Sequence, residues 1–204
     1  MITIVDYHTG NLGSIVNMLK KIGQEAQITA DPALIGNADK LLLPGVGAFD
    51  AGMENLERSG LIPLLNQRVL QDRVPTLGIC LGMQLMTRSS EEGTRAGLGW
   101  IDAQALRFRP ADATQKVPHM GWNRVMLARP SPLTDELPQE PRFYFVHSFY
   151  VRCRDSADVL LTTPFGESFA SGFQRGNVWG VQFHPEKSHK FGMALLRNFA
   201  ERVN

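Results

Sequence analysis

The first half of the chain alternates short apolar runs with segments of helical periodicity, and this alternation limits the possible folds more than any other sequence feature. Residues 2–5 form a β-branched apolar run. Apolar residues then recur at helical spacing until Gly23, a residue typical of helix ends. Strands and helices in this order predict a parallel sheet that is covered on both faces. The further strands and helices that we predict in this half lie at 26–29, 40–43, 51–59, 61–71, 74–79 and 81–87.

The second half has shorter strand-like segments that are rich in aromatic residues, which is typical of antiparallel strands. A tight connection is expected at 172–176, and the apolar face of 188–203 is typical of a helix that docks on a sheet. The sequence therefore predicts an α/β fold with a mostly parallel central sheet and additional antiparallel strands, in one domain that covers residues 1–204. The strands that we predict in this half lie at 143–146, 159–163, 169–174 and 178–183.

Charge, hydropathy and cysteine usage narrow the class of protein. The 21 basic and 20 acidic residues nearly cancel and form no basic run, which argues against a nucleic-acid partner. No apolar stretch reaches the roughly 18 residues of a membrane-spanning helix, and Asp6 interrupts the apolar start that a signal peptide would continue. Cys80 and Cys153 stand in unlike contexts and do not suggest a disulfide framework. We expect a cytoplasmic protein whose partners are small molecules or other proteins, with no membrane involved.

Cys80 stands in a pattern that presents a nucleophile. It lies between a predicted strand and a predicted helix, with Gly78 and Gly82 two positions before and after it. A nucleophile elbow needs small residues at both positions, because the backbone turns sharply there. The helix that follows also directs its first amides and its dipole at the sulfur, which favours a thiolate. A buried structural cysteine is the alternative for Cys80, and it is the better interpretation of Cys153.

The segment 180–186 supplies a base for this nucleophile and a group that can orient the base. Pro185 favours an extended backbone at His184, so we expect residues 184 and 186 to emerge on the same side of the chain. Glu186 would then bind one ring nitrogen of His184 while the other nitrogen faces the thiol. A histidine at a strand end is more often structural, and the combination with Cys80 is what favours a catalytic role.

Residues 44–47, Pro-Gly-Val-Gly, directly follow a predicted strand. Two glycines allow the backbone to approach a ligand closely, so the amides of Val46, Gly47 and Leu81 are candidates for an oxyanion site. An ordinary strand-to-helix turn explains the same four residues equally well. A phosphate-binding loop does not, because neither a Walker lysine nor a G-x-G-x-x-G pattern follows.

The segments around Cys80 and His184 resemble the signatures of class I glutamine amidotransferases, whose glutaminase domains use a Cys-His-Glu triad. Within that family the chain looks like the glutaminase subunit of imidazole glycerol phosphate synthase. The resemblance covers essentially the whole chain and implies the flavodoxin-like sheet of the family. The segments that carry it are 6–12, 44–47, 78–84, 117–123, 144–148 and 184–188.

The resemblance implies a reaction and a partner. Cys80 would attack the side-chain amide of glutamine, His184 would protonate the departing ammonia, and water would hydrolyse the resulting thioester to glutamate. Ammonia would pass to a separate cyclase subunit, a (β/α)₈ barrel, in histidine biosynthesis. Neither a cofactor nor a metal ion is implied. The residues that match substrate contacts of the family are Gln84, His147, Ser148 and Phe149, and those in segments that resemble its interface are Asn11, Met120, Trp122, Tyr144 and Lys187.

Two alternatives stand beside this hypothesis. A glutaminase for pyridoxal phosphate or anthranilate synthesis is disfavoured by the motif 118–123, and a catalytically silent scaffold is disfavoured because competent residues fill all three triad positions. Trp122 and Tyr144 also fit ordinary core packing. The peptide of Val46 keeps an N–H that a proline would lack, and its glycine neighbours allow it to rotate. We therefore expect the isolated chain to have low glutaminase activity until its partner binds.

Overall fold

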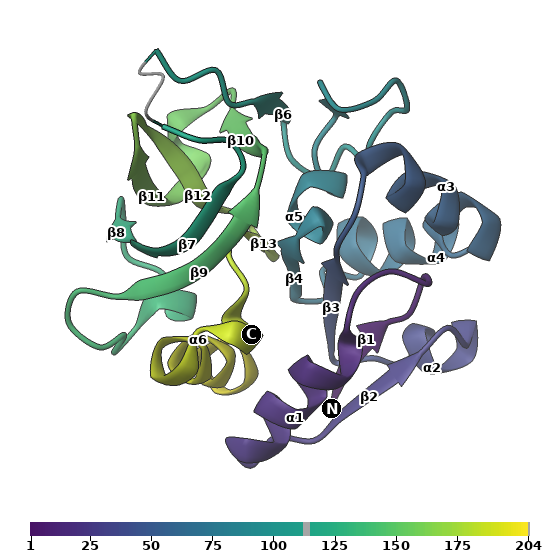
Figure 1. Ribbon diagram of the computed structural model, residues 1–204. Coiled ribbons are helices and arrows are strands. Elements are labelled where there is room, and N and C mark those ends of the chain that lie inside the picture. Colours follow the sequence, from purple (N-terminus) through teal and green to yellow (C-terminus); the bar gives the residue numbers. More distant parts are fainter. Residues whose placement is uncertain (112–114, 204) are drawn as a thin grey trace.

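The computed structural model describes residues 1–111 and 115–203 and has an α/β fold with a mostly parallel central sheet, as predicted (Figure 1). The strand order along the sheet is β2-β1-β3-β4-β13-β12-β10-β6-β5. The first five strands in this order are parallel to their neighbours, and β12 then runs antiparallel to β13. The parallel strands are β1 (Ile2–Val5), β2 (Ala26–Thr29), β3 (Lys40–Gly45), β4 (Thr76–Cys80) and β13 (Val178–Val181).

Helices cover both faces of this parallel part, and alternate residues of its strands reach one face or the other. Leu42 of β3 packs in a core with α1 and α6, whereas Leu41 and Leu43 pack in a second core with α3, α4 and α5. Figure 1 shows α1 and α6 side by side, away from α3 and α4. The helices are α1 (Leu12–Lys21), α2 (Pro32–Gly36), α3 (Phe49–Ser59), α4 (Ile62–Asn66), α5 (Leu81–Leu85) and α6 (His189–Glu201).

The second half adds antiparallel strands, as the aromatic segments predicted. β7 and β9 pair as a separate two-stranded ribbon, in which His119 lies opposite His147 and Trp122 lies opposite Tyr144. In Figure 1 this ribbon lies on the side of the molecule opposite α3 and α4. The strands are β5 (Ser89–Ser90), β6 (Ala103–Arg107), β7 (His119–Arg124), β8 (Met126–Leu127), β9 (Arg142–His147), β10 (Phe149–Cys153), β11 (Val159–Phe165) and β12 (Glu167–Arg175).

Two local predictions were wrong. The helix expected over 81–87 ends at Leu85, because the amide of Thr87 donates to the carbonyl of Gln84, three residues back, at 3.0 Å and so closes the last turn. The tight connection expected at 172–176 is shorter, because Gly172 lies inside β12 and pairs with Val181. A Cβ at Gly172 would lie 2.9 Å from Leu161 Cδ1, so this glycine serves strand packing.

Two predicted helices differ in smaller ways. The segment expected at 61–71 is α4 followed by a π-helical segment, Gln67–Gln71, and the last helix is two residues shorter at its end than predicted. Within the described part of the chain, none of the helices combines the length and hydropathy needed to span a bilayer.

Candidate active site

Cys80 lies where β4 meets α5, in a backbone conformation that few side chains adopt. Its φ is 54°, in the left-handed region, so the turn is strained. A Cβ at Gly78 would lie 2.8 Å from the amide nitrogen of Met83, and a Cβ at Gly82 would overlap the carbonyl oxygen of Leu43. Both flanking glycines are therefore required by close backbone packing, as expected for a nucleophile elbow.

His184 follows β13 and is held from both sides. Its Nδ1 lies 2.8 Å from Oε1 of Glu186, so the expected hydrogen bond between these side chains is present. The backbone at His184 is extended, as predicted, but the residues after it do not continue in that geometry, because Pro185–Lys187 form a 3₁₀ turn. The hydroxyl of Ser188 closes this turn by donating to the carbonyl of His184 at 2.6 Å. The amide of His184 donates to the carbonyl of Tyr144 on β9 at 2.9 Å.

The imidazole of His184 is buried, and its charge depends on its two neighbours. Burial alone would lower the pKa of His184, but the nearby groups of Cys80 and Glu186 outweigh it and raise that pKa to about 10. The imidazolium form is therefore favoured at neutral pH. Nε2 is buried and has no hydrogen-bond partner among the described residues. This nitrogen can therefore exchange a proton with a molecule that occupies the adjoining cavity.

A cavity of about 360 Å³ brings most of the predicted site residues together. Both Cys80 and His184 line it. Glu186 lies behind His184 and lines a separate small cavity with Val46 and Asn11. Glu92 also lines the main cavity and was missed, because nothing in the local sequence marks it. Pro118 and Val146 line it as well; they stand in segments that carry the family resemblance but were not singled out. The predicted residues that line it are Val46, Gly47, Cys80, Leu81, Gln84, His147, Ser148, Phe149 and His184.

Two buried glutamines connect Cys80 to the backbone of Phe149. Nε2 of Gln84 donates to Oε1 of Gln182 at 3.0 Å and to the carbonyl of Phe149 at 3.2 Å. Nε2 of Gln182 in turn lies 3.7 Å from Sγ of Cys80. Gln182 was missed by the sequence analysis, although it stands in the segment 180–186 that contains His184. The side-chain nitrogen of Gln84 is thus bonded to protein groups, whereas its Oε1 is left for other contacts.

The loop 44–47 is anchored at its start and exposed beyond it. The buried hydroxyl of Tyr7 donates to the carbonyl of Pro44 at 2.6 Å. Val46 is exposed, and Gly47 has a φ of 109°, a conformation that favours glycine. The chain can therefore change conformation at Val46 and Gly47 while Pro44 stays fixed.

The other candidate residues lie on the surface formed by β7, β9 and the turn after His184. Met120 is 62% exposed and Trp122 is 47% exposed, so the core-packing alternative for Trp122 was wrong. Tyr144 is half-buried, and Nζ of Lys187 lies 5.8 Å from its ring centroid. Asn11, at the start of α1, is exposed.

Cys153 differs from Cys80 in its environment. Burial, assisted by Asp158 and Asp155, raises the pKa of the Cys153 thiol to about 12. This thiol is therefore protonated at neutral pH, which agrees with its interpretation as a structural cysteine.

Comparisons with known proteins identify the family. The family described as glutamine amidotransferase class-I matches residues 3–203. The chain is 54% identical over 203 residues to imidazole glycerol phosphate synthase subunit HisH 2 of Methanococcus maripaludis, and 49% identical over 203 residues to the protein of that name from Pseudomonas aeruginosa. Each alignment covers 100% of both chains.

Solved structures share the fold at lower identity. A crystal structure of a glutamine amidotransferase has a TM-score of 0.77 at 18% identity and covers 98% of each chain. PurLQS from Thermotoga maritima has a TM-score of 0.75 at 17% identity, covering 100% of this chain and 98% of that one. The chain therefore belongs to the class I glutamine amidotransferase family, among the HisH subunits of imidazole glycerol phosphate synthase.

Proposed function

We propose that the chain is the glutaminase subunit of imidazole glycerol phosphate synthase, and that Cys80, His184 and Glu186 hydrolyse glutamine to glutamate and ammonia. One observation carries the proposed chemistry. The buried Nε2 of His184 has no partner among the described residues, its Nδ1 is held by Glu186, and its ring lines the same cavity as Cys80. A base held in this way beside a thiol is the arrangement that nucleophilic catalysis needs. The HisH relatives support the histidine pathway over pyridoxal phosphate or anthranilate synthesis.

In the first half of the reaction, the Cys80 thiolate adds to the side-chain amide carbon of glutamine. The amide oxygen becomes negatively charged, and the backbone amides of Val46, Gly47 and Leu81 are the candidates that stabilise it. His184 is protonated at neutral pH because its pKa is about 10, and it donates its Nε2 proton to the amide nitrogen. The C–N bond breaks, ammonia leaves, and a glutamyl thioester remains on Cys80.

In the second half, neutral His184 accepts a proton from water through Nε2 while the water oxygen adds to the thioester carbonyl carbon. The C–S bond breaks, the new side-chain carboxylic acid loses its proton to solvent, and glutamate is released. Cys80 then regains the thiolate, and His184 has regained its proton. Glu186 stabilises the imidazolium in both halves by its hydrogen bond to Nδ1.

Charge in the cavity supports an orientation for the substrate. Glu92 supplies the one carboxylate among the described residues that line the cavity, so it attracts the α-ammonium group of glutamine. Its Oε2 also accepts from the amide of Phe49 at 2.8 Å, which fixes the position of the side chain. The backbone at Ser148 and Phe149 lies on the same wall as Gln84 and is available for the α-carboxylate.

The surface made by Met120, Trp122, Tyr144 and Lys187, with Asn11 beside it, is our candidate for the interface with a (β/α)₈-barrel cyclase subunit. Exposed methionine and tryptophan side chains, such as those of Met120 and Trp122, are typical of a protein interface. Because the exposed Val46 loop shares a small cavity with Asn11, partner binding can reach the oxyanion site. We expect glutamate production to rise at least tenfold when the liganded cyclase is added, and equal rates with and without it would contradict this activation.

We also infer that residues 1–204 act as one glutaminase domain in the cytoplasm. The family match over residues 3–203 supports the first point. The two free cysteines support the second, because proteins of reducing compartments rarely form disulfides.

Cys80→Ala tests the proposed chemistry. The complex of this variant with the cyclase should lose glutamine-dependent synthesis but keep synthesis from added ammonia, because the acceptor site is in the other subunit. Formation of glutamate and of imidazole glycerol phosphate is measured separately, with Cys153→Ala as the matched control that keeps both. Glutamine hydrolysis by a folded Cys80→Ala chain would exclude Cys80 as the nucleophile.

A further inference from the structure

A row of hydrogen bonds links β7 to the wall of the glutamine cavity. Nδ1 of His119 lies 2.9 Å from Nε2 of His147, and Nδ1 of His147 lies 2.7 Å from the carbonyl oxygen of Phe149. At the other end, Nδ2 of Asn123 lies 3.1 Å from Nε2 of His119. Both imidazoles are buried, so these contacts are not exchanged with bulk water.

The chemistry of the groups fixes the direction of every hydrogen bond in this row. A carbonyl oxygen only accepts, so His147 donates from Nδ1. Burial lowers the pKa of His147 to about 3 and that of His119 to about 4, so both rings are neutral at physiological pH. Nε2 of His147 therefore accepts from Nδ1 of His119, and Nε2 of His119 accepts from the side-chain amide of Asn123. Both histidines carry their proton on Nδ1.

The same row continues to the nucleophile. The Phe149 carbonyl also accepts from Gln84, which donates to Gln182, and Gln182 lies 3.7 Å from Sγ of Cys80. His119 is thus connected through His147 to the backbone that lines the cavity. It also directly precedes Met120 in β7, the strand of the candidate interface.

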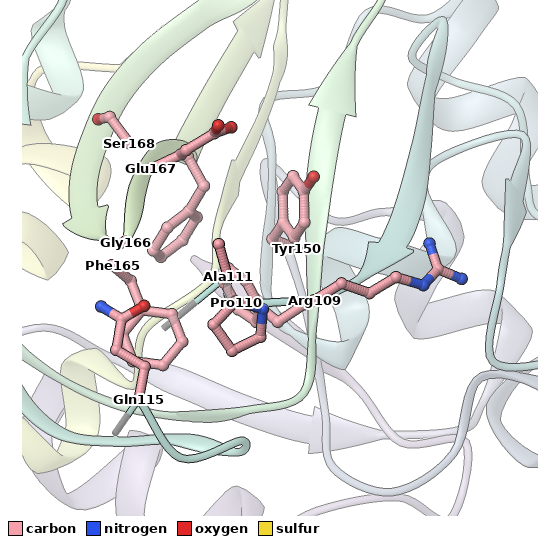
Figure 2. A pocket seen from close by; sticks show the side chains of 11 residues that line it. Arg109, Pro110, Ala111, Gln115, Tyr150, Phe165, Gly166, Glu167 and Ser168 are labelled. Atoms are coloured by element: carbon pink, nitrogen blue, oxygen red, sulfur yellow. The ribbon is translucent and has the colours of Figure 1, made fainter. Parts of the chain in front are cut away.

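Aromatic rings that do not line the glutamine cavity pack against the two histidines. Phe108 lies 5.3 Å from His147, and Phe165 lies 4.3 Å from His119, measured between ring centroids. Phe108 and Phe165 also line a second cavity of about 350 Å³. Figure 2 shows Phe165 and Tyr150 around it. Because phenyl rings offer no strong hydrogen-bonding group, they do not compete for the imidazole nitrogens. The partners of His119 and His147 are those named above.

We propose that His119 is a positioning residue for glutamine binding, which acts by donating a hydrogen bond to His147 and so holds the backbone at Ser148 and Phe149. The proposal rests on the glutaminase function proposed for the adjoining cavity. His119 does not itself line that cavity. Loss of its donor leaves Nε2 of His147 buried without a partner and frees the ring to reorient.

The first test removes the donor while keeping the packing. His119→Phe fits the surrounding aromatic rings, and in the complex with the cyclase it should raise the KM for glutamine about tenfold, with a smaller change in kcat. His119→Asn places an amide donor near the position of Nδ1 and should restore most of the affinity, whereas His119→Gln should not. Equal KM values in the wild type and a folded His119→Phe variant would overturn the proposal. So would equal defects in His119→Phe and His119→Asn.

The second test determines which imidazole nitrogens carry a proton, and it uses the isolated chain. ¹⁵N NMR of the imidazole nitrogens should show both His119 and His147 protonated on Nδ1. Asn123→Asp replaces the amide donor by a carboxylate, which should move the proton of His119 to Nε2 and raise the KM for glutamine as His119→Phe does. A proton on Nε2 of His147 in the wild-type chain would overturn the proposal whether or not any variant folds.

The two proposals fail in different ways. If glutamine is not the substrate, Cys80→Ala has no glutamine-dependent activity to abolish, but the NMR result is unchanged. If His119 has only a structural role, Cys80→Ala still abolishes the activity. His119→Phe then lowers the unfolding temperature without moving KM.

Discussion

The two halves of the molecule supply residues of the candidate active site by different means. The parallel half places Cys80 through backbone packing, because Gly78 and Gly82 allow close approach of neighbouring chain. The antiparallel half fixes His147, and also His184 beyond the end of β13, through hydrogen bonds between residues far apart in sequence, such as the amide of His184 with the carbonyl of Tyr144. The first arrangement is rigid and local. The second depends on several strands keeping their register.

This difference has a consequence for regulation. A partner that binds β7 and β9 contacts the half whose geometry rests on hydrogen bonds, and it does not need to move the elbow at Cys80. The loop at Val46 lines the same cavity as Cys80 and His184. It is held just before Val46, where Tyr7 binds Pro44 and Gly45 pairs with β4. Substitutions in the parallel half should therefore remove the site, whereas those in the antiparallel half should adjust it.

Gly82→Ala should have the largest effect. The new methyl group would overlap the carbonyl oxygen of Leu43, so β3 and α5 would have to move apart at a cost of about 3 kcal/mol or more. We expect loss of glutaminase activity and a large fall in the free energy of unfolding, measured by urea denaturation. Gly36→Ala is the matched control, because the nearest atom to its Cβ, Leu64 Cδ1, lies 3.9 Å away. A stable and active Gly82→Ala chain would contradict the rigid arrangement.

Glu186→Gln should act next most strongly, in the turn that holds His184. The substitution keeps a hydrogen-bonding group near Nδ1 of His184 but removes the charge, so kcat should fall about a hundredfold or more while the chain stays folded. The pKa of His184 should also fall, which moves the alkaline loss of activity to lower pH. A pH profile of kcat for the assembled complex measures both effects. An unchanged alkaline limb would show that Glu186 does not stabilise the imidazolium.

Protonation of His184, which Cys80 and Glu186 both favour, makes stability depend on pH. The pKa of His184 is about 10 in the folded chain against an ordinary value of 6.5, so the folded state binds this proton more tightly. The resulting stabilisation is complete below pH 6.5 and is lost as the pH rises through 10. In Glu186→Gln this stabilisation should be lost at lower pH than in the wild type. Free energies of unfolding measured by urea denaturation at a series of pH values would show the difference.

The contrast between the halves also explains what could be predicted from the sequence. Parallel strands, the elbow and the contact of Glu186 with His184 follow from neighbouring residues, so the sequence analysis found them. Gln182 acquires its partners only when β13 lies beside β4, and His119 meets His147 only through the pairing of β7 with β9. Such roles depend on strand register, which periodicity alone does not determine.

Met120→Ala should have the smallest effect and tests whether the antiparallel half carries the partner surface. Removing a 62%-exposed methionine barely changes the stability of the isolated chain, but at an interface it should raise the Kd for the cyclase about tenfold. Met126→Ala is the matched control, because Met126 is 48% exposed on β8, outside the candidate interface. Titration calorimetry with the cyclase compares the two variants. If Met126→Ala weakens binding and Met120→Ala does not, the interface lies over β8. The partner would then affect the active site without contacting the exposed face of β7.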